Sequence, residues 1–135
     1  MPKNVEKMST NYSPNFGLAK RTKKNIKYLI FHYTGMKSDK LALRKLTNFN
    51  SKVSCHYYID KNGKLIQLVP DYYIAWHAGK SFWKGDKLLN KSSIGIEISN
   101  PGHEHGYKAF KKKQINCLIK ISKKLIKKYK IKKQN

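Results

Sequence analysis

Two short hydrophobic segments constrain the fold of this chain more than any other feature. Residues 28–33 (YLIFHY) are almost wholly apolar, and residues 93–99 (SIGIEIS) alternate isoleucine with small or polar residues. The first pattern is typical of a strand buried on both faces, and the second of a strand with one apolar face. Both segments should therefore lie within a β-sheet that forms the centre of the domain.

The rest of the chain supplies helices and a hairpin around these strands. Residues 38–49 predict a helix capped by Ser38, and residues 53–69 predict a β-hairpin around the turn signal at 60–63 (DKNG). Residues 109–129 predict an amphipathic helix with one lysine-rich face. The order strand, helix, hairpin, strand, helix indicates an α/β fold.

The length of the chain fits one domain with a single core. Residues 1–25 show no hydrophobic periodicity and predict an extended N-terminal arm, followed by a domain over 26–135. Residues 1–24 contain no apolar run of signal-peptide length, and no segment is long enough to span a membrane. These features predict a cytoplasmic protein, and action in the periplasm would need another route of export.

The formal net charge is +23, from 30 Lys and Arg against 7 Asp and Glu. Such a balance favours anionic partners, namely nucleic acid, acidic membrane surfaces or cell-wall polymers. A solvated lysine-rich surface is the simpler interpretation, so charge alone selects no partner.

The two cysteines, Cys55 and Cys117, form neither a disulfide framework nor a metal-binding CxxC pair. Cys55 is followed directly by His56, which raises the possibility of a thiol nucleophile with its base. Adjacent strand residues face opposite sides of a sheet, so this pair is rejected as a catalytic dyad.

Glu97 and His32 are the strongest candidates for chemistry. Glu97 lies in the middle of a strand, where a carboxylate is costly to bury unless it is paired, hydrogen-bonded or near a metal. The small neighbours Gly95 and Ser99 would leave open space beside it. His32 lies near the end of its strand and suits either a zinc ligand or a hydrogen-bonded core residue.

Three further histidines lie in loops. His77 belongs to the long irregular segment 70–92 and either contacts substrate or caps that loop. His103 and His105 have a spacing that is weak as a metal motif, and solvated polar residues explain them better.

Read together, these segments resemble the zinc-dependent N-acetylmuramoyl-L-alanine amidases, a family related to T7-type lysozyme and the peptidoglycan recognition proteins. The segments occur in the family's order and cover the chain from residue 13 to about 130. The matching stretches are residues 13–17 (SPNFG), 29–36 (LIFHYTGM), 53–57 (VSCHY), 60–63 (DKNG), 75–79 (AWHAG), Asn90, 93–98 (SIGIEI), 100–104 (NPGHE) and 106–107 (GY).

The resemblance implies a mixed central β-sheet flanked by helices, with a substrate groove across one end. It implies that His32 is a zinc ligand and that Glu97 is the general base acting on a zinc-bound water. Trp76 and His77 would form part of the groove wall. The implied reaction is hydrolysis of the amide between the muramoyl lactyl group and L-alanine, with peptidoglycan or muropeptides as partners.

The sequence departs from the family after the helix at 109–129. The family continues there with a strand bearing a second histidine ligand and a loop with a Lys-x-Asp segment that holds the third ligand, whereas the sequence ends at Asn135. We therefore expect an amidase domain that lacks the last strand and the C-terminal zinc loop. Zinc binding should be weak or absent in this chain alone, and activity impaired or dependent on a complementing segment.

Two other functions remain open from the sequence. The first is a non-catalytic peptidoglycan-binding module that uses the same groove. The second is a basic protein that contacts nucleic acid, without sequence specificity, or a membrane surface through its lysines.

Overall fold

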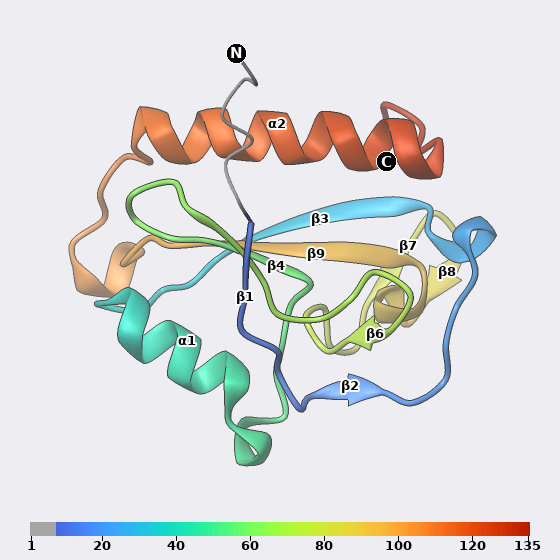
Figure 1. Ribbon diagram of the computed structural model, residues 1–135, viewed down its shortest axis with the longest axis horizontal. Helices are drawn as coiled ribbons and strands as arrows, with labels where there is room; N and C mark the ends of the chain where they lie inside the picture. Colours follow the sequence, from blue (N-terminus) through green and yellow to red (C-terminus); the bar gives the residue numbers. More distant parts are fainter. Residues whose placement is uncertain (1–7) are drawn as a thin grey trace.

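The computed structural model describes residues 8–135, and its centre is a mixed five-stranded sheet (Figure 1). The strands, in their order across the sheet, are β1 (Ser9–Thr10), β5 (Leu65–Gln67), β4 (Tyr57–Ile59), β9 (Ser93–Ile98) and β3 (Tyr28–Tyr33). β4 and β5 are antiparallel, while the pairs β1–β5, β4–β9 and β3–β9 are parallel. The mixed sheet that the resemblance implies is confirmed.

Two helices cover opposite faces of this sheet, α1 (Asp39–Thr47) on one side and α2 (Lys112–Tyr129) on the other (Figure 1). The predicted cap of the first helix is confirmed, because the Ser38 side chain accepts a hydrogen bond from the Leu41 backbone N–H at 3.2 Å. The second helix begins three residues later than predicted and ends at the predicted residue.

The alternation in β9 divides the core into two layers. Ile94, Ile96 and Ile98 pack beneath α2 together with Ile121 and Leu125 of that helix. The residues between these isoleucines face the side of the sheet that carries α1. The predicted separation of the isoleucines from Glu97 is therefore confirmed, and it places a carboxylate on the less apolar layer.

Short strands and 3₁₀ turns complete the fold. The minor strand pairs are β2 (Phe16–Gly17) with β6 (Ile74–Ala75) and β7 (Phe82–Trp83) with β8 (Asp86–Lys87). The 3₁₀ helices are η1 (Lys23–Asn25), η2 (Phe49–Ser51), η3 (Leu89–Lys91) and η4 (His103–His105). The predicted hairpin is present, but its strands are confined to β4 and β5 and are shorter than 53–69.

The segment before β3 packs onto the domain from residue 8 onward. The side chain of Asn15 is fully buried, and its Nδ2 donates to the carbonyl oxygens of Asn48 and Val53, each at 2.8 Å. The Ser13 hydroxyl donates to the carbonyl of Leu46 at 2.6 Å. These bonds attach the segment to the end of α1. Residues 1–7 of the predicted arm lie outside the described residues.

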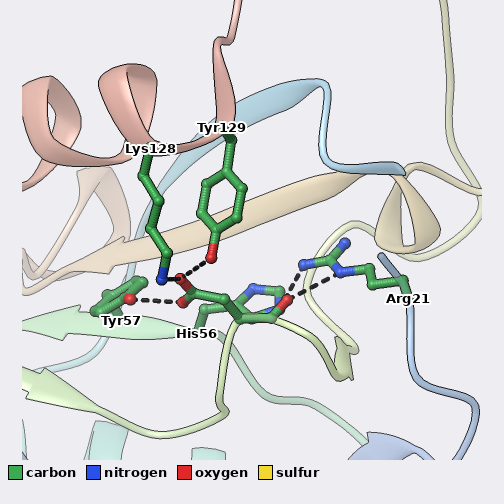
Figure 2. Close-up of polar contacts among 6 residues, drawn as sticks. Arg21, His56, Tyr57, Lys128 and Tyr129 are labelled. Carbon is green, nitrogen blue, oxygen red and sulfur yellow. Dashed lines mark hydrogen bonds and ion pairs between the residues drawn. The ribbon is translucent and has the colours of Figure 1, made fainter. Parts of the chain in front are cut away.

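A buried carboxylate ties the C-terminal turn of α2 to the sheet. Asp71 is only 6% exposed and accepts hydrogen bonds from the hydroxyls of Tyr57, at 2.5 Å, and Tyr129. Lys128 lies 3.4 Å from the same carboxylate, so these groups converge from β4 and α2 (Figure 2). Arg21 donates to the Asp71 carbonyl at 3.0 Å, and burial lowers the pKa of this guanidinium to about 10. The cluster joins four segments of the chain, around Arg21, Tyr57, Asp71 and Tyr129.

β3 forms one edge of the sheet, and its outer side chains are open to solvent. Phe31 is 50% exposed and Tyr33 is 54% exposed. The Leu29 backbone N–H on this edge donates to the carbonyl of Asn135 at 3.1 Å. Within residues 8–135, neither helix combines the length and hydrophobicity needed to cross a bilayer.

Candidate active site

The parallel pairing of β3 with β9 brings the two strongest candidates side by side. His32 and Glu97 are direct partners in the register, although 65 positions separate them in the sequence. Both side chains extend toward the α1 side, because Leu29 and the isoleucines of β9 occupy the α2 side. The two chemical groups that the sequence singles out therefore meet on one face.

Glu97 lines a small pocket of about 160 Å³ between the sheet and α1. The lining combines apolar residues of α1 with polar residues of the strands and loops. Its members are Thr34, Met36, Ala42, Lys45, Leu46, Val53, Ser54, Trp76, His77 and Glu97. The two residues predicted to contact substrate, Trp76 and His77, thus line the same pocket as the predicted base.

Burial changes the acidity of Glu97. Loss of hydration disfavours the ionised form and raises the pKa of this carboxyl from 4.5 to about 7, while the positive charge of Lys45 acts in the opposite direction. A carboxyl group with a pKa near neutrality can both take up and release a proton at physiological pH.

His77 is held with its ring beneath β9. The Asn90 side-chain oxygen accepts from the backbone N–H groups of His77, at 3.1 Å, and Ala78, at 2.8 Å, which fixes the loop. The ring lies against the backbone of Gly95, where an added Cβ would meet it at 2.4 Å. The space that Gly95 was expected to leave beside Glu97 is therefore occupied by an imidazole.

The imidazoles of His32 and His77 are in direct contact. Nε2 of His32 lies 3.0 Å from Nδ1 of His77, and the ring centroids are 5.2 Å apart in an edge-to-face arrangement. Nε2 of His77 in turn lies 3.0 Å from the Ser93 hydroxyl oxygen. Burial lowers the pKa of both histidines, so both rings are neutral at physiological pH.

Cys55 and His56 do not form a dyad. The thiol is buried with residues of the α1 layer, and burial raises its pKa well above the usual value. His56 is fully buried, and its Nδ1 accepts from the Gly95 backbone N–H at 3.0 Å while its Nε2 lies 2.9 Å from the Tyr73 carbonyl. The structure thus assigns this histidine a role in holding backbone.

The described residues do not form a complete metal site. No group of three or more His, Cys, Asp or Glu side chains within residues 8–135 could hold a metal ion. His103 and His105 are exposed on η4, where the ring of His103 stacks on Tyr107 with centroids 5.0 Å apart. Within residues 8–135 neither histidine joins a metal-binding group with His32, so neither replaces a ligand there.

Some residues of the site escaped the sequence argument. The sequence identifies Lys45 only as part of a helix, because nothing in a lysine-rich sequence marks one lysine as lining a pocket. It identifies Ser93 only as a strand residue, although the spacing Ser93-x-Gly95-x-Glu97 is itself informative. Small residues two apart on the face of a candidate base indicate that another side chain packs there.

Comparison with known proteins identifies the relatives of this chain. The sequence model of the N-acetylmuramoyl-L-alanine amidase family, Amidase_2, matches residues 22–135. The N-acetylmuramoyl-L-alanine amidase AmiD of Escherichia coli K12 is 40% identical over 122 residues, which cover 82% of this chain and 43% of AmiD. The 1,6-anhydro-N-acetylmuramyl-L-alanine amidase AmpD of Citrobacter freundii is 45% identical over 47 residues, covering 35% of this chain and 25% of AmpD.

The fold is similar to solved structures of the same proteins. E. coli AmiD in complex with anhydro-N-acetylmuramic acid-L-Ala-D-gamma-Glu-L-Lys superposes with a TM-score of 0.74 at 37% identity, covering 88% of this chain and 50% of that one. A selenomethionine AmpD derivative superposes with a TM-score of 0.76 at 26% identity, covering 93% and 76%.

A third structure is AmpDh3 from Pseudomonas aeruginosa, in complex with an anhydromuramic pentapeptide. It gives a TM-score of 0.73 at 26% identity and covers 86% of this chain and 51% of its own. The chain spans less than half the length of the curated AmiD and AmpD sequences that it matches. The family match extends over most of the chain and includes both His32 and Glu97, and the chain belongs to the N-acetylmuramoyl-L-alanine amidase family.

Proposed function

We propose that this domain hydrolyses the amide between the lactyl group of N-acetylmuramic acid and L-alanine in peptidoglycan fragments. The observation that carries this proposal is the placement of Glu97. A partly buried carboxyl with a pKa of about 7 lines a pocket and pairs in register with His32. The relatives' activity and the chain's membership of their family support the same assignment.

Glu97 acts as the general base in this proposal. Its ionised form accepts a proton from water as the water oxygen attacks the lactyl–alanine carbonyl carbon. It then passes that proton to the alanine nitrogen as the C–N bond breaks. A positioned base of this kind contributes about 10²–10⁴ to the rate. A pKa near 7 serves both steps, because the carboxylate and the acid are comparably populated.

His32 is our candidate for one zinc ligand, as the family resemblance implies. A catalytic zinc site takes three protein ligands and a water. The described residues offer no such group of three, so a complete zinc site does not fit residues 8–135 alone. The metal therefore enters the proposal only as an expectation for a protein in which further ligands are present.

Muropeptides are the proposed substrates. The ligands named with AmiD and AmpDh3 are anhydromuramic acid peptides of three and five residues, respectively, which carry free carboxylates. The pocket of this chain contains Lys45, whose positive charge suits an anionic peptide stem, and Trp76, whose ring suits a sugar or peptide face.

A chimaera with E. coli AmiD tests the proposal. The chain would be assayed for release of peptide from anhydromuropeptide, alone and fused to the AmiD segment that follows the matched region. We expect the fusion to cleave and to bind zinc. Glu97→Gln in the fusion should retain zinc while lowering kcat by about 10²–10⁴.

Two further variants define the outcome of this experiment. His32→Ala in the fusion should weaken zinc binding, because two ligands remain, whereas His103→Ala on the exposed turn should change neither property. If the fusion folds and binds zinc but Glu97→Gln cleaves at the parental rate, the role of Glu97 is wrong. If the fusion binds anhydromuropeptide without cleaving it, the domain is a binding module.

A second partner class is favoured by one specific observation. A cavity of about 480 Å³ at the opposite end of β3 from His32 is lined by lysines over an apolar floor. The lysines are Lys23, Lys24, Lys27, Lys84, Lys130 and Lys132. We propose that this surface attracts anionic cell-wall polymer by charge alone. Binding of polyphosphate should then fall steeply with salt and weaken when the lysines are changed to glutamine.

A further inference from the structure

A chain of hydrogen bonds connects His32 to the backbone of η3. It begins at the carbonyl oxygen of Leu89, which lies 2.6 Å from the hydroxyl oxygen of Ser93. The same hydroxyl oxygen lies 3.0 Å from Nε2 of His77, and Nδ1 of His77 lies 3.0 Å from Nε2 of His32. Three side chains and one carbonyl thus form a continuous series.

The direction of every bond in this series is fixed by its first member, the carbonyl oxygen of Leu89. A carbonyl oxygen can only accept, so the Ser93 hydroxyl must donate its single hydrogen to Leu89. The Ser93 oxygen must then accept from Nε2–H of His77. A neutral imidazole that carries its proton on Nε2 has an unprotonated Nδ1, which accepts. Nε2 of His32 must therefore be the donor to His77.

We propose that His77 is a positioning residue, which locks His32 in one orientation and in the tautomer protonated on Nε2. The remaining ring nitrogen of His32, Nδ1, then carries a lone pair. Within residues 8–135 this nitrogen has no hydrogen-bond partner. It is the atom through which His32 would contact a metal ion or a substrate proton, a role that rests on the proposed function.

The surroundings of His77 are built to hold this arrangement. Asn90 fixes the backbone at two successive N–H groups, and the absence of a side chain at Gly95 admits the ring beneath β9. Ligating histidines in proteins commonly donate their second ring N–H to a fixed acceptor, which sets the tautomer. Here a second histidine is that acceptor, and its own tautomer is fixed in turn by Ser93.

Nitrogen-15 NMR of the metal-free full chain tests the proposal directly. Long-range proton–nitrogen spectra distinguish a protonated from an unprotonated ring nitrogen for each histidine. We expect both His32 and His77 to be protonated on Nε2 and unprotonated on Nδ1. His103→Gln, which removes an exposed ring, serves as the control and should leave these signals unchanged.

Variants of His77 separate positioning from simple packing. His77→Phe keeps a ring in the slot but removes the acceptor, so His32 should become a mixture of tautomers. His77→Gln offers a side-chain oxygen to His32 and an amide to Ser93, and it should restore most of the Nε2-protonated form. A merely structural role for His77 predicts no such recovery.

Ser93→Ala supplies a second test if His77→Phe does not fold. Loss of the Ser93 oxygen should release the tautomer of His77 and, through it, that of His32. Protonation of His32 on Nδ1 in the parent chain would overturn the proposal, as would an unchanged His32 signal in a folded His77→Phe. These measurements use neither metal nor substrate, so their failure leaves the assignment of Glu97 standing, and failure of hydrolysis leaves the tautomer lock standing.

Discussion

The imidazole of His77 occupies the volume that a side chain at Gly95 would need. A Cβ built on Gly95 would lie 2.4 Å from Cγ of the ring and 2.6 Å from Nδ1. The His77 ring is hydrogen-bonded to Ser93, and the His77 backbone N–H is hydrogen-bonded to Asn90. The ring therefore cannot move away from Gly95 without breaking a hydrogen bond. The glycine is required by a close approach between two segments, and its backbone angles are those of an ordinary strand.

Gly95→Ala should therefore destabilise the protein, although alanine favours a strand more than glycine does. We expect a loss of about 1–3 kcal/mol, the range for overpacking a tight site, measured by urea unfolding. The double variant Gly95→Ala/His77→Ala removes the ring that the new methyl group meets. It should be less destabilised than the sum of the two single variants, and strict additivity would contradict the steric explanation.

Glu97 should make the stability of the metal-free protein fall with rising pH. Its pKa is raised from 4.5 to about 7, so the folded state holds the proton more tightly than the unfolded state does. Stability is then greatest at low pH, falls as pH rises from 4.5 to about 7, and levels off above that. A shift of this size corresponds to about 3 kcal/mol.

Glu97→Gln removes the ionisation and should flatten this profile. We expect the variant to have a higher melting temperature than the parent at pH 8 and a similar one near pH 4.5. Lys45→Gln should act oppositely, raising the pKa of Glu97 further, because Lys45 stabilises the carboxylate. Identical pH profiles for parent and Glu97→Gln would show that another group governs the dependence.

The Asp71 cluster should contribute strongly to stability. Both carboxylate oxygens of Asp71 accept hydrogen bonds from tyrosine hydroxyls, and Lys128 lies beside one of them. Asp71→Asn removes the negative charge and replaces one of these acceptor oxygens with an NH₂ donor. We expect a loss of about 3–5 kcal/mol, as for breaking other buried charged networks. Tyr129→Phe should cost about 1–2 kcal/mol, whereas Tyr107→Phe, at an exposed ring, should cost nothing measurable in thermal unfolding.

The open edge of β3 should promote self-association. Phe31 and Tyr33 are half exposed on an edge strand, where apolar side chains favour pairing with another molecule. Phe31→Lys should lower concentration-dependent light scattering and leave the melting temperature nearly unchanged. Equal scattering by the parent and the variant would place the associating surface elsewhere.

Local patterns were sufficient to predict the two α-helices and the strands β3, β4, β5 and β9, but not the short strands and 3₁₀ turns within residues 8–25 and 70–92. The alternation in β9 and the serine before α1 are each interpretable from a few neighbouring residues, because the physical effects involved act over one or two turns or strand positions. The buried attachment of Asn15 to the end of α1 was not predicted. It depends on the carbonyl groups of Asn48 and Val53, which only the folded chain brings to the same side chain.

The sequence predicted which residues form the candidate site, but not the contacts between them. Glu97 stands out because a carboxylate interrupts an apolar strand, and His32 because it lies near the end of one. The contact between His32 and His77 joins β3 to a loop 45 positions away, and no periodicity encodes it. Lys45 was missed for the same reason, since its proximity to Glu97 arises from the packing of α1 on the sheet.

The register of β3 against β9 has a consequence for the uniformity of the folded population. A slip of one position would turn Glu97 into the layer beneath α2 and expose the isoleucines on the other face. Such a molecule would place a bare carboxylate in hydrocarbon and would not survive as a folded species. Burial of the isoleucines therefore selects the register that aligns His32 with Glu97. All folded molecules should share this alignment.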